Sequence, residues 1–333
     1  MGRHQDLPYR YLFADLILSS NTALPELPPL SSNSFQPADQ EAPLEVTFSN
    51  RSPLAAQPDR WLVRIGGRRR PWMCLGLTQN GYLLRFLGIA DFLLDSSGRW
   101  IQARSDGRTT KRRVAHLLLD HVLPLALSLR QKTVLHASAV VTRDGCCVFT
   151  GPSGSGKSTL AASFQADGAE LLSDDCVMLT ERNGSVWVTP TYRSLRLWSD
   201  SLRHLVPPQP AEPVRFGSSI KHSVLAQAGR TRFAYPVRRI YHLSADRIRL
   251  NGQRRSPIAS HATVEILPPR EGLVHLLGSL RRINMTDPAG LIRELESLSP
   301  IVEAVSVKRL IVPHRYDRLD EVREVVRQDL RGT

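Results

Sequence analysis

The stretch GPSGSGKS at residues 151–158 decides the fold class of this chain. It fits the pattern G-x-x-x-x-G-K-[ST] at every fixed position. It follows the apolar run CCVFT (146–150) and precedes a helical pattern that starts at Gly156 or Lys157 and ends before Gly168. Such a turn aims backbone N–H groups at phosphate oxygens, and the helix N-terminus adds a positive dipole. The stretch therefore predicts a phosphate-binding loop (P-loop) in an α/β domain.

The P-loop pattern gives its residues expected roles. Lys157 reaches the β- and γ-phosphates of a nucleotide, and the Ser158 hydroxyl is a magnesium ligand. ATP and Mg²⁺ are therefore the expected cofactors. The residues expected to contact the nucleotide are Gly151, Ser153, Gly154, Ser155, Gly156, Lys157, Ser158 and Thr159. The alternative is a glycine-rich turn that binds no ligand.

Two adjacent aspartates close the stretch GAELLSDD (168–175), which ends shortly after the P-loop. A strand–helix–strand path of this length brings Asp174 and Asp175 back beside the P-loop strand, near the γ-phosphate. One carboxylate can hold magnesium, and the other can accept the proton of an attacking hydroxyl. A magnesium ATPase that activates water could use the same pair, and a turn that caps a strand is the structural alternative. The NKxD motif of switch GTPases and the LSGGQ motif of ABC-type ATPases are both missing from the sequence.

Composition and charge limit the class of protein. The chain has 333 residues, enough for two domains, and its 41% hydrophobic and 23% charged residues are ordinary for a soluble protein. It has neither a continuous apolar run of membrane-spanning length nor an apolar leader, so we expect a cytoplasmic protein without a membrane segment. The four cysteines show no metal-ligand spacing and are expected to be reduced and buried.

The net charge of +13 comes from arginine-rich groups that are spread along the chain with few aromatic residues between them. Nucleic-acid binding usually needs a concentrated basic face, so no nucleic acid is expected as a partner. A generally basic surface and attraction of an acidic or phosphorylated partner remain the two interpretations.

The texture of the sequence changes near residue 112. Residues 1–111 contain short apolar runs between turn signals, including Asn80-Gly81, and predict a smaller β-rich module. Residues 112–130 have helical spacing and are placed at the start of a catalytic domain, 112–333. Within it, the Pro- and Gly-containing segment 207–235 predicts a mobile loop, and 316–330 predicts an amphipathic helix.

Three stretches together resemble the catalytic domain of bacterial HPr kinase/phosphorylase: LHASAVV (135–141), GPSGSGKSTLA (151–161) and GAELLSDDCVML (168–179). The resemblance covers roughly 112–330. It is closest to the branch encoded in lasso-peptide gene clusters, whose members phosphorylate a serine of the precursor peptide and share runs like YRSLRLWSDSL (192–202) and VKRLIVPHRYDRLDEV (307–322). It implies an HPr kinase/PEP carboxykinase-like P-loop fold.

The resemblance also implies roles for individual residues. His136 matches a histidine that lies beside the reacting phosphate, although a histidine in an apolar strand is by itself more often a core residue. Asp174 matches the base and Asp175 the metal side. Arg196 would steady phosphate or a second metal site, or it is an ordinary strand-edge arginine. Lys221 lies near the loop that closes over substrate.

Two departures from the family narrow the expected activity. An EIRG signature and a PGRN-like loop are missing, so the reverse phosphorylase activity is not expected, and residues 1–111 do not resemble the N-terminal module of the HPr enzymes. We therefore expect an ATP- and magnesium-dependent kinase of a serine-type hydroxyl, with a precursor peptide or a small acceptor protein as partner. A homo-oligomer is left open. The alternatives are a nucleotide-regulated binding protein with weak ATPase activity, and a kinase of HPr itself or of a small metabolite.

Overall fold

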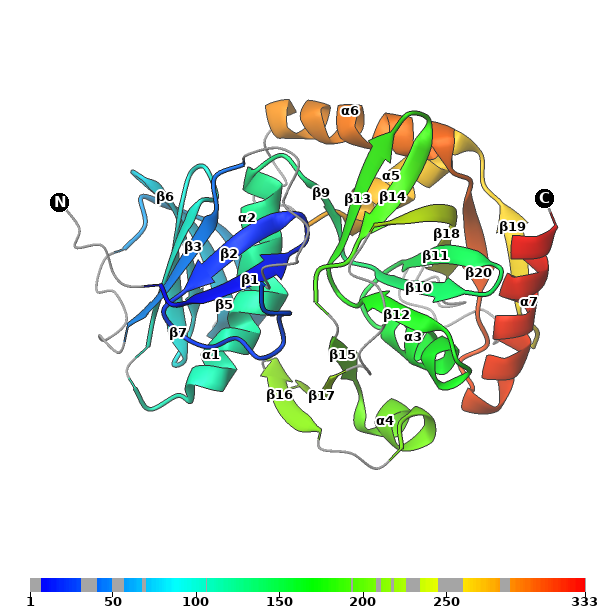
Figure 1. Cartoon of the computed structure of the whole chain (residues 1–333), viewed down its shortest axis with the longest axis horizontal. Coiled ribbons are helices and arrows are strands. Elements are labelled where there is room, and N and C mark those ends of the chain that lie inside the picture. Colours follow the sequence, from blue (N-terminus) through cyan, green and yellow to red (C-terminus); the bar gives the residue numbers. More distant parts are fainter. Residues whose placement is uncertain are drawn as a thin grey trace. The chain divides into compact units, whose positions relative to one another are not determined.

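The structure of the chain is a computed structural model that describes residues 7–30, 41–49, 57–67, 70–105, 107–192, 194–207, 211–216, 219–225, 234–244, 260–281 and 288–332. It contains large sheets together with helices, a mixed α/β structure as predicted (Figure 1). The chain divides into two compact units. The first comprises Met1–Lys132, Val214–Ile220 and Arg281–Asp287, and the second comprises Thr133–Pro213, Lys221–Leu280 and Pro288–Thr333.

The first unit contains an eight-stranded sheet with the order β1-β2-β3-β8-β7-β6-β5-β4. Most neighbours are antiparallel, and β3 runs parallel to both β2 and β8. β5 and β6 form the hairpin predicted around Asn80-Gly81, in which Thr78 pairs with Gly81. The strands are β1 (Tyr9–Phe13), β2 (Leu16–Ser20), β3 (Leu44–Ser49), β4 (Arg60–Gly67), β5 (Arg70–Thr78), β6 (Gly81–Phe86), β7 (Ala90–Asp95) and β8 (Trp100–Arg104).

The first unit extends to Lys132 before the chain enters the second unit. The sequence pattern predicts an earlier boundary, after residue 111. The intervening helical segment consists of α1 (Lys111–Leu117), a π-helical turn (Leu118–Val122) and α2 (Leu123–Leu129). It packs on the first sheet: the His121 ring lies 5.6 Å from Trp72 and 5.5 Å from Phe86. Burial of its apolar face, which local spacing cannot assign to a partner, decides the unit to which this segment belongs.

The second unit is organised around a nine-stranded sheet with the order β12-β10-β11-β18-β14-β13-β9. The long strand β18 (Tyr235–Ser244) pairs in parallel with both β11 and β20, and its first residues also pair with β14. β19 completes this sheet beside β20. The remaining strands are β9 (Thr133–Leu135), β10 (Ser138–Thr142), β11 (Gly145–Thr150), β12 (Glu170–Ser173), β13 (Val177–Arg182), β14 (Ser185–Thr189), β19 (Thr263–Ile266) and β20 (Val307–Ile311).

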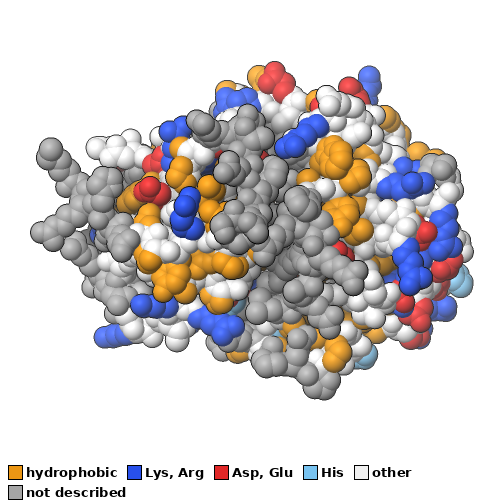
Figure 2. Space-filling model, viewed as in Figure 1, with side chains coloured by type: hydrophobic (Ala, Val, Ile, Leu, Met, Phe, Trp, Pro, Cys, Tyr) orange, Lys and Arg blue, Asp and Glu red, His pale blue; other side chains and the backbone are white. Residues whose placement is uncertain are grey.

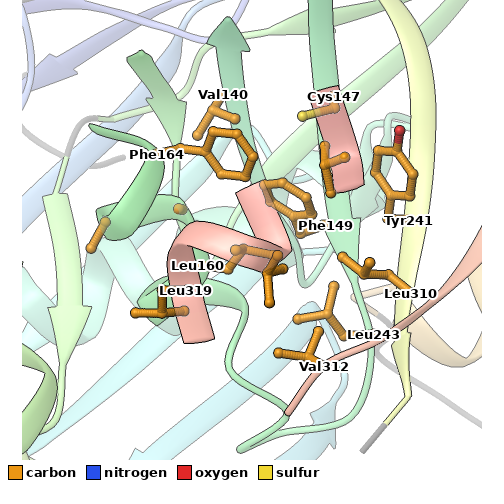
Figure 3. Close-up of a cluster of buried hydrophobic side chains, with 14 of the residues drawn as sticks. Val140, Cys147, Phe149, Leu160, Phe164, Tyr241, Leu243, Leu310, Val312 and Leu319 are labelled. Carbon is orange, nitrogen blue, oxygen red and sulfur yellow. The ribbon is translucent and has the colours of Figure 1, made fainter. Parts of the chain in front are cut away.

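Helices bury both faces of this sheet. On one face α3 (Lys157–Ala166) and α7 (Leu319–Arg331) contribute to a core with Phe149, Phe164 and Tyr241 (Figure 3). On the other face α5 (Pro269–Ser279) and α6 (Pro288–Ala304) pack on a separate core. Alternation along β11 places Cys147 in the first core and its neighbour Cys146 in the second. All four cysteines are buried free thiols, as expected.

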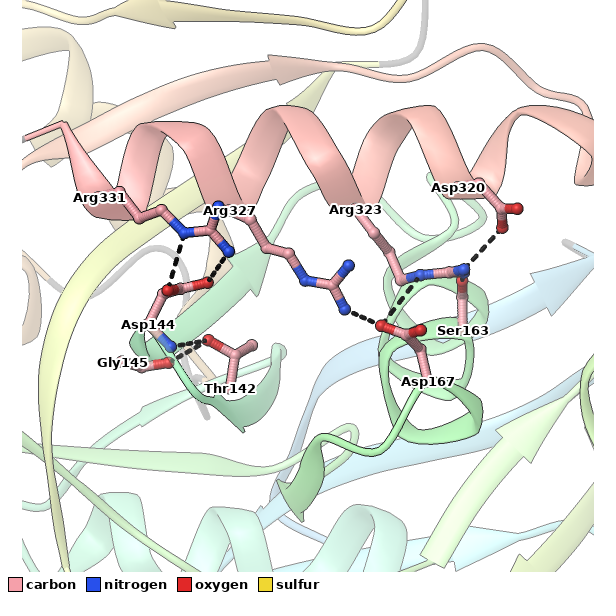
Figure 4. Close-up of polar contacts among 9 residues, drawn as sticks. All are labelled: Thr142, Asp144, Gly145, Ser163, Asp167, Asp320, Arg323, Arg327 and Arg331. Carbon is pink, nitrogen blue, oxygen red and sulfur yellow. Dashed lines mark hydrogen bonds and ion pairs between the residues drawn. The ribbon is translucent and has the colours of Figure 1, made fainter.

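The amphipathic helix expected at 316–330 is present as a 3₁₀ turn (Tyr316–Arg318) followed by α7. Its polar face carries three arginines at helical spacing (Figure 4). Arg323 and Arg327 form ion pairs with Asp167 at the end of α3, and Arg331 pairs with Asp144 in the β10–β11 turn over 3.0 Å. The charged face of α7 therefore ties the P-loop helix to the sheet.

The segment 207–235, which we expected to be a loop, contains two strands. β16 (Glu212–Phe216) and β17 (Ser219–Leu225) form a small sheet with β15 (Ser194–Leu197), in the order β15-β17-β16. Pairing of Val224 with the distant Leu195 outweighs the local Pro and Gly content. Residues 208–210, 217–218 and 226–233 of this segment lie outside the described residues. The helix α4 (Ser199–Leu205) follows β15 directly.

The surface of the described residues is mixed in charge. On the face shown in Figure 2, basic side chains are interspersed with acidic, apolar and other side chains. Among the described residues, no helix combines the length and the apolar character needed to cross a membrane.

Candidate functional site

The P-loop follows β11 and ends where α3 begins. Three of its glycines have positive φ: 137° at Gly151, 82° at Gly154 and 98° at Gly156. Side chains are disfavoured in these conformations. At Gly151 the contact with the neighbouring strand adds a second requirement, because a Cβ atom would lie 2.8 Å from the carbonyl oxygen of Leu243 in β18. The tight turn and the close approach to β18 explain why the fixed positions of the pattern are glycine.

Lys157 and Ser155 supply polar groups inside this loop. Lys157 is only 5% exposed, and its Nζ donates to the carbonyl oxygens of Gly151 (2.8 Å) and Pro152 (3.0 Å). The buried Ser155 Oγ has no hydrogen-bond partner among the described residues. A buried hydroxyl without a partner is costly, and a phosphate oxygen in the loop would satisfy it. The cradle thus fits the phosphates that the sequence pattern predicts.

Asp174 is fully buried and lies directly against the P-loop helix. Its Oδ1 accepts hydrogen bonds from Ser138 Oγ (2.6 Å) and Ser158 Oγ (3.0 Å), and its Oδ2 accepts from the Arg196 N–H (3.1 Å). Burial, reinforced by the charge of Asp175, raises the pKa of Asp174 to about 6, while the Ser138 hydrogen bond and Arg196 N–H oppose the shift. Asp174 and Ser158 therefore form one polar pair.

Asp175 faces a different environment. It has a φ of 63°, in the left-handed region that non-glycine residues rarely adopt. Asp175 Oδ1 lies 3.3 Å from Nδ1 of His136, in the bend between β9 and β10, and both residues line the cavity at the P-loop. Asp174 thus lies beside Ser158, the serine that the sequence predicts as a magnesium ligand, whereas Asp175 lines the cavity.

Arg196 and Lys221 both reach the same cavity. Arg196 is 1% exposed, and its guanidinium donates to the hydroxyls of Ser194 and Ser223, so it is not an ordinary strand-edge arginine. Lys221 belongs to β17, and its Nζ lies 5.7 Å from the ring centroid of Trp198. The small sheet therefore contributes two cations to the cavity wall.

All the residues that line the cavity belong to the second unit. They are His136, Ser153, Gly154, Ser155, Gly156, Lys157, Ser158, Thr159, Leu160, Asp175, Arg196, Trp198, Lys221, Val312, Pro313, His314, Arg315, Tyr316 and Leu319. Every sequence-predicted site residue is in this set except Gly151 and Asp174, which lie immediately behind it.

Several residues at or next to the cavity were not predicted as site residues from the sequence. Ser138, three residues after β9 ends, was part of the LHAS stretch but had no assigned role. Trp198 and Tyr316 lie in the runs 192–202 and 307–322, which contributed to the resemblance without suggesting a chemistry. Their proximity to the P-loop depends on the pairing of β15 with β17 and of β20 with β18.

The described residues hold no group of three or more His, Cys, Asp or Glu side chains that could form an all-protein metal site. Magnesium does not need one, because it usually keeps several waters and binds one or two protein oxygens together with substrate phosphates. The Ser158 hydroxyl and the Asp174 carboxylate, 3.0 Å apart, provide such a partial donor set.

Comparison with known proteins adds little to this description. No protein-family model matches the chain, and no curated protein matches it. Among solved structures it is similar to the HPr(Ser) kinase/phosphatase from Coxiella burnetii, with 12% sequence identity over 59% of this chain and 95% of that chain and a TM-score of 0.28. A likeness at this TM-score carries no argument about chemistry, so function is inferred from the site.

Proposed function

We propose that this protein is an ATP- and magnesium-dependent kinase of the HPr-kinase type that transfers the γ-phosphate of ATP to a serine-type hydroxyl of a precursor peptide. One observation supports it above all: at the P-loop, one buried carboxylate is bonded to Ser158 while its sequence neighbour faces the cavity beside His136. Binding phosphate alone would not need the second carboxylate.

The proposed metal side consists of Ser158 and Asp174. Bound there, Mg²⁺ would neutralise charge on the β- and γ-phosphates. Ser138 and the Arg196 N–H fix the orientation of the Asp174 carboxylate through hydrogen bonds of 2.6 and 3.1 Å. Because outer partners of this kind orient a metal ligand, we assign them a positioning role.

The proposed base is Asp175. Its carboxylate is 13% exposed, which leaves it accessible to an acceptor hydroxyl in the cavity. The hydroxyl would give its proton to Asp175 as its oxygen forms the bond to the γ-phosphorus and the bond to the ADP oxygen breaks. His136, 3.3 Å from Asp175 Oδ1, holds this carboxylate in place.

The remaining cations stabilise the transferred phosphoryl group. Lys157 lies inside the cradle, and Arg196 is fixed in the cavity wall by two serine hydroxyls. Fixed donors aimed at developing phosphoryl charge are a main source of rate enhancement in phosphoryl transfer. The helix N-terminus at Lys157 adds to the same field.

The choice of a peptide as acceptor rests on the resemblance of the motifs around the P-loop to the lasso-peptide-cluster kinases. The cavity is compatible with it, because Trp198 at its edge is 43% exposed and lies beside Lys221. An exposed aromatic residue next to a cation offers contact area to a peptide. The expected site of action is the cytoplasm.

The test follows radiolabelled γ-phosphate. The protein is incubated with labelled ATP, magnesium and a serine-containing lasso precursor peptide, and the Ser→Ala version of that peptide is the matched control. We expect label on the serine peptide only. Label released solely as inorganic phosphate would favour a nucleotide-regulated binding protein with weak ATPase activity. Label on HPr or on a small hydroxyl metabolite, and not on the peptide, would mean that the acceptor is a different molecule. The proposed catalytic site would then be unaffected.

A further inference from the structure

Tyr316 is an aromatic residue at the P-loop cavity whose ring is held in place by several contacts. It follows β20, lines the P-loop cavity and also borders a shallower neighbouring hollow that contains His204. The His204 ring stacks on Tyr316 with 4.2 Å between centroids and 5° between planes. His204 is fixed in turn, because its Nδ1 lies 2.8 Å from the carbonyl oxygen of Asp200 in α4. The Tyr316 ring is thus a supported flat surface at the cavity wall.

A chain of hydroxyl groups connects this ring to the P-loop helix. Thr159 Oγ1 bonds to Ser201 Oγ over 3.0 Å, and Ser201 Oγ bonds to the Tyr316 hydroxyl over 3.1 Å. Ser201 is buried in α4, which packs beside α3. Two hydrogen bonds therefore hold the aromatic ring at a fixed position relative to the first turn of α3.

The direction of a bound nucleotide follows from the P-loop. Lys157 and the aspartate pair mark the γ-phosphate end, whereas the backbone of the loop holds the α- and β-phosphates. Thr159 is one residue farther into α3 than the magnesium serine, and its side chain turns toward Ser201 and Tyr316. The nucleoside of ATP must leave the P-loop away from Asp175, and Tyr316 lines the same cavity and is linked to Thr159 through Ser201.

We infer that the base of the nucleotide stacks on the ring of Tyr316. His204, which lines the neighbouring hollow, stacks on the same ring and supports it. This inference deepens the proposed kinase function and rests on it. An aromatic face stacks on every base, because each base has a π-face. Recognition through Tyr316 therefore depends on the presence of a base and only weakly on its identity, so GTP binds nearly as well as ATP.

The acceptor is then expected beside Asp175, away from the base. His136, Lys221 and Trp198 line the same cavity as Asp175. The two substrates approach the γ-phosphorus from opposite ends, as in-line transfer requires.

The test compares the binding of ATP and of inorganic tripolyphosphate, measured by calorimetry with magnesium, for the full chain and for the variant Tyr316→Leu. Leucine keeps apolar volume against the core and removes the flat ring. We expect ATP to bind about tenfold more weakly to Tyr316→Leu, because loss of one base–aromatic stack has an effect of this order. Tripolyphosphate, which has no base, should bind equally to both. Tyr82→Leu, in the other unit, is the matched control and should change neither.

Equal ATP affinity for Tyr316→Leu and the unchanged chain overturns the inference and leaves the kinase proposal intact. An equal loss of ATP and tripolyphosphate affinity also overturns it, since the ring would then support the P-loop. A raised KM for the peptide with unchanged ATP affinity would assign Tyr316 to the acceptor instead. If the unchanged chain binds neither ligand, both the proposed function and the inference fall.

A second measurement works if Tyr316→Leu does not fold. The fluorescence of 1,N6-etheno-ATP is quenched when its base stacks on an aromatic ring. Quenching on binding to the unchanged chain supports the stack, and bound etheno-ATP without quenching overturns it.

Discussion

Ser158 donates a 3.0 Å hydrogen bond to Asp174, whereas the next residue, Asp175, lies against His136. Two aspartates that are adjacent in the sequence thus belong to two different polar groups. Asp174 is bonded to Ser138 and Ser158, and Asp175 has a positive φ and pairs with His136. This separation gives the pair two distinguishable roles in the proposed reaction.

Substitution of each aspartate by asparagine should separate these roles. Asp175→Asn should keep magnesium–ATP affinity and lose about 10²–10⁴ in transfer rate, because asparagine cannot accept a proton at neutral pH. Asp174→Asn should weaken magnesium binding, so part of its defect should recover at high magnesium. Single-turnover transfer across a magnesium titration measures both effects. Rescue of Asp175→Asn and not of Asp174→Asn would restore the order implied by the sequence resemblance.

Lys157→Met should lower the transfer rate by about 10²–10³ and leave the fold intact, because methionine keeps the aliphatic stem and removes the cation. Single-turnover kinetics and circular dichroism measure the two effects. Lys111→Met, at an exposed position in α1, is the matched control. Transfer at the unchanged rate by a folded Lys157→Met variant would remove the P-loop lysine from the mechanism.

The transfer rate at limiting magnesium should fall as the pH drops below about 6. The pKa of Asp174 is raised to about 6 by burial and by Asp175, and only the ionised carboxylate suits magnesium. Ser138→Ala removes a hydrogen bond that lowers this pKa, so the acidic limb of the pH profile should move to higher pH. Ser185→Ala, on an exposed strand end, is the control. If the acidic limb of the pH profile does not move in Ser138→Ala, Ser138 does not influence the group whose titration controls the rate.

Stability should fall as the pH decreases from about 6.5 toward 4. The pKa of His242 is lowered to about 4, first by burial and then by the nearby charges of His275, Arg309 and Lys157. An unfolded histidine binds its proton near pH 6.5, so between the two values the unfolded state binds more protons and gains relative stability. The His242→Gln variant should show a shallower decline of melting temperature with pH. The variant His314→Gln, at an exposed position, should leave the decline unaltered.

The arginines of α7 should contribute unequally to stability. Arg331 is 60% exposed, so solvent screens its pair with Asp144, and Arg331→Ala should change the free energy of unfolding little. Arg323 is 13% exposed and contacts Asp167, Asp320 and the Ser163 hydroxyl, so Arg323→Ala should cost about 1–2 kcal/mol. Urea unfolding of the two alanine variants measures the difference. A larger loss for Arg331→Ala would contradict this ranking.

Local patterns predicted the elements whose causes are local. The glycine spacing of the P-loop, the Asn80-Gly81 hairpin and the amphipathic α7 each follow from a few neighbouring residues, and the structure contains all three. The aspartate pair was also expected to return beside the P-loop, and Asp174 lies in contact with Ser158.

Features that depend on partners distant in the sequence could not be predicted from local patterns. Segment 207–235 reads as a loop until β15 is available to pair with β17. The partners of each aspartate carboxylate, Ser138 and Ser158 for Asp174 and His136 for Asp175, come from other elements and are not specified by the residue types. Tyr316 reaches the cavity only because β20 pairs with β18.

The register of β11 against β18 has a consequence for how the chain acquires its nucleotide site. Phe149 pairs with Tyr241, and Gly151 lies against the carbonyl oxygen of Leu243, so the cradle is supported by a strand synthesised much later. Closing such a long loop is slow and precedes any gain from the contacts within it. During translation the phosphate-binding motif is therefore exposed long before its supporting strand emerges from the ribosome. Nucleotide affinity arises late in folding, when the end of β18 is in place.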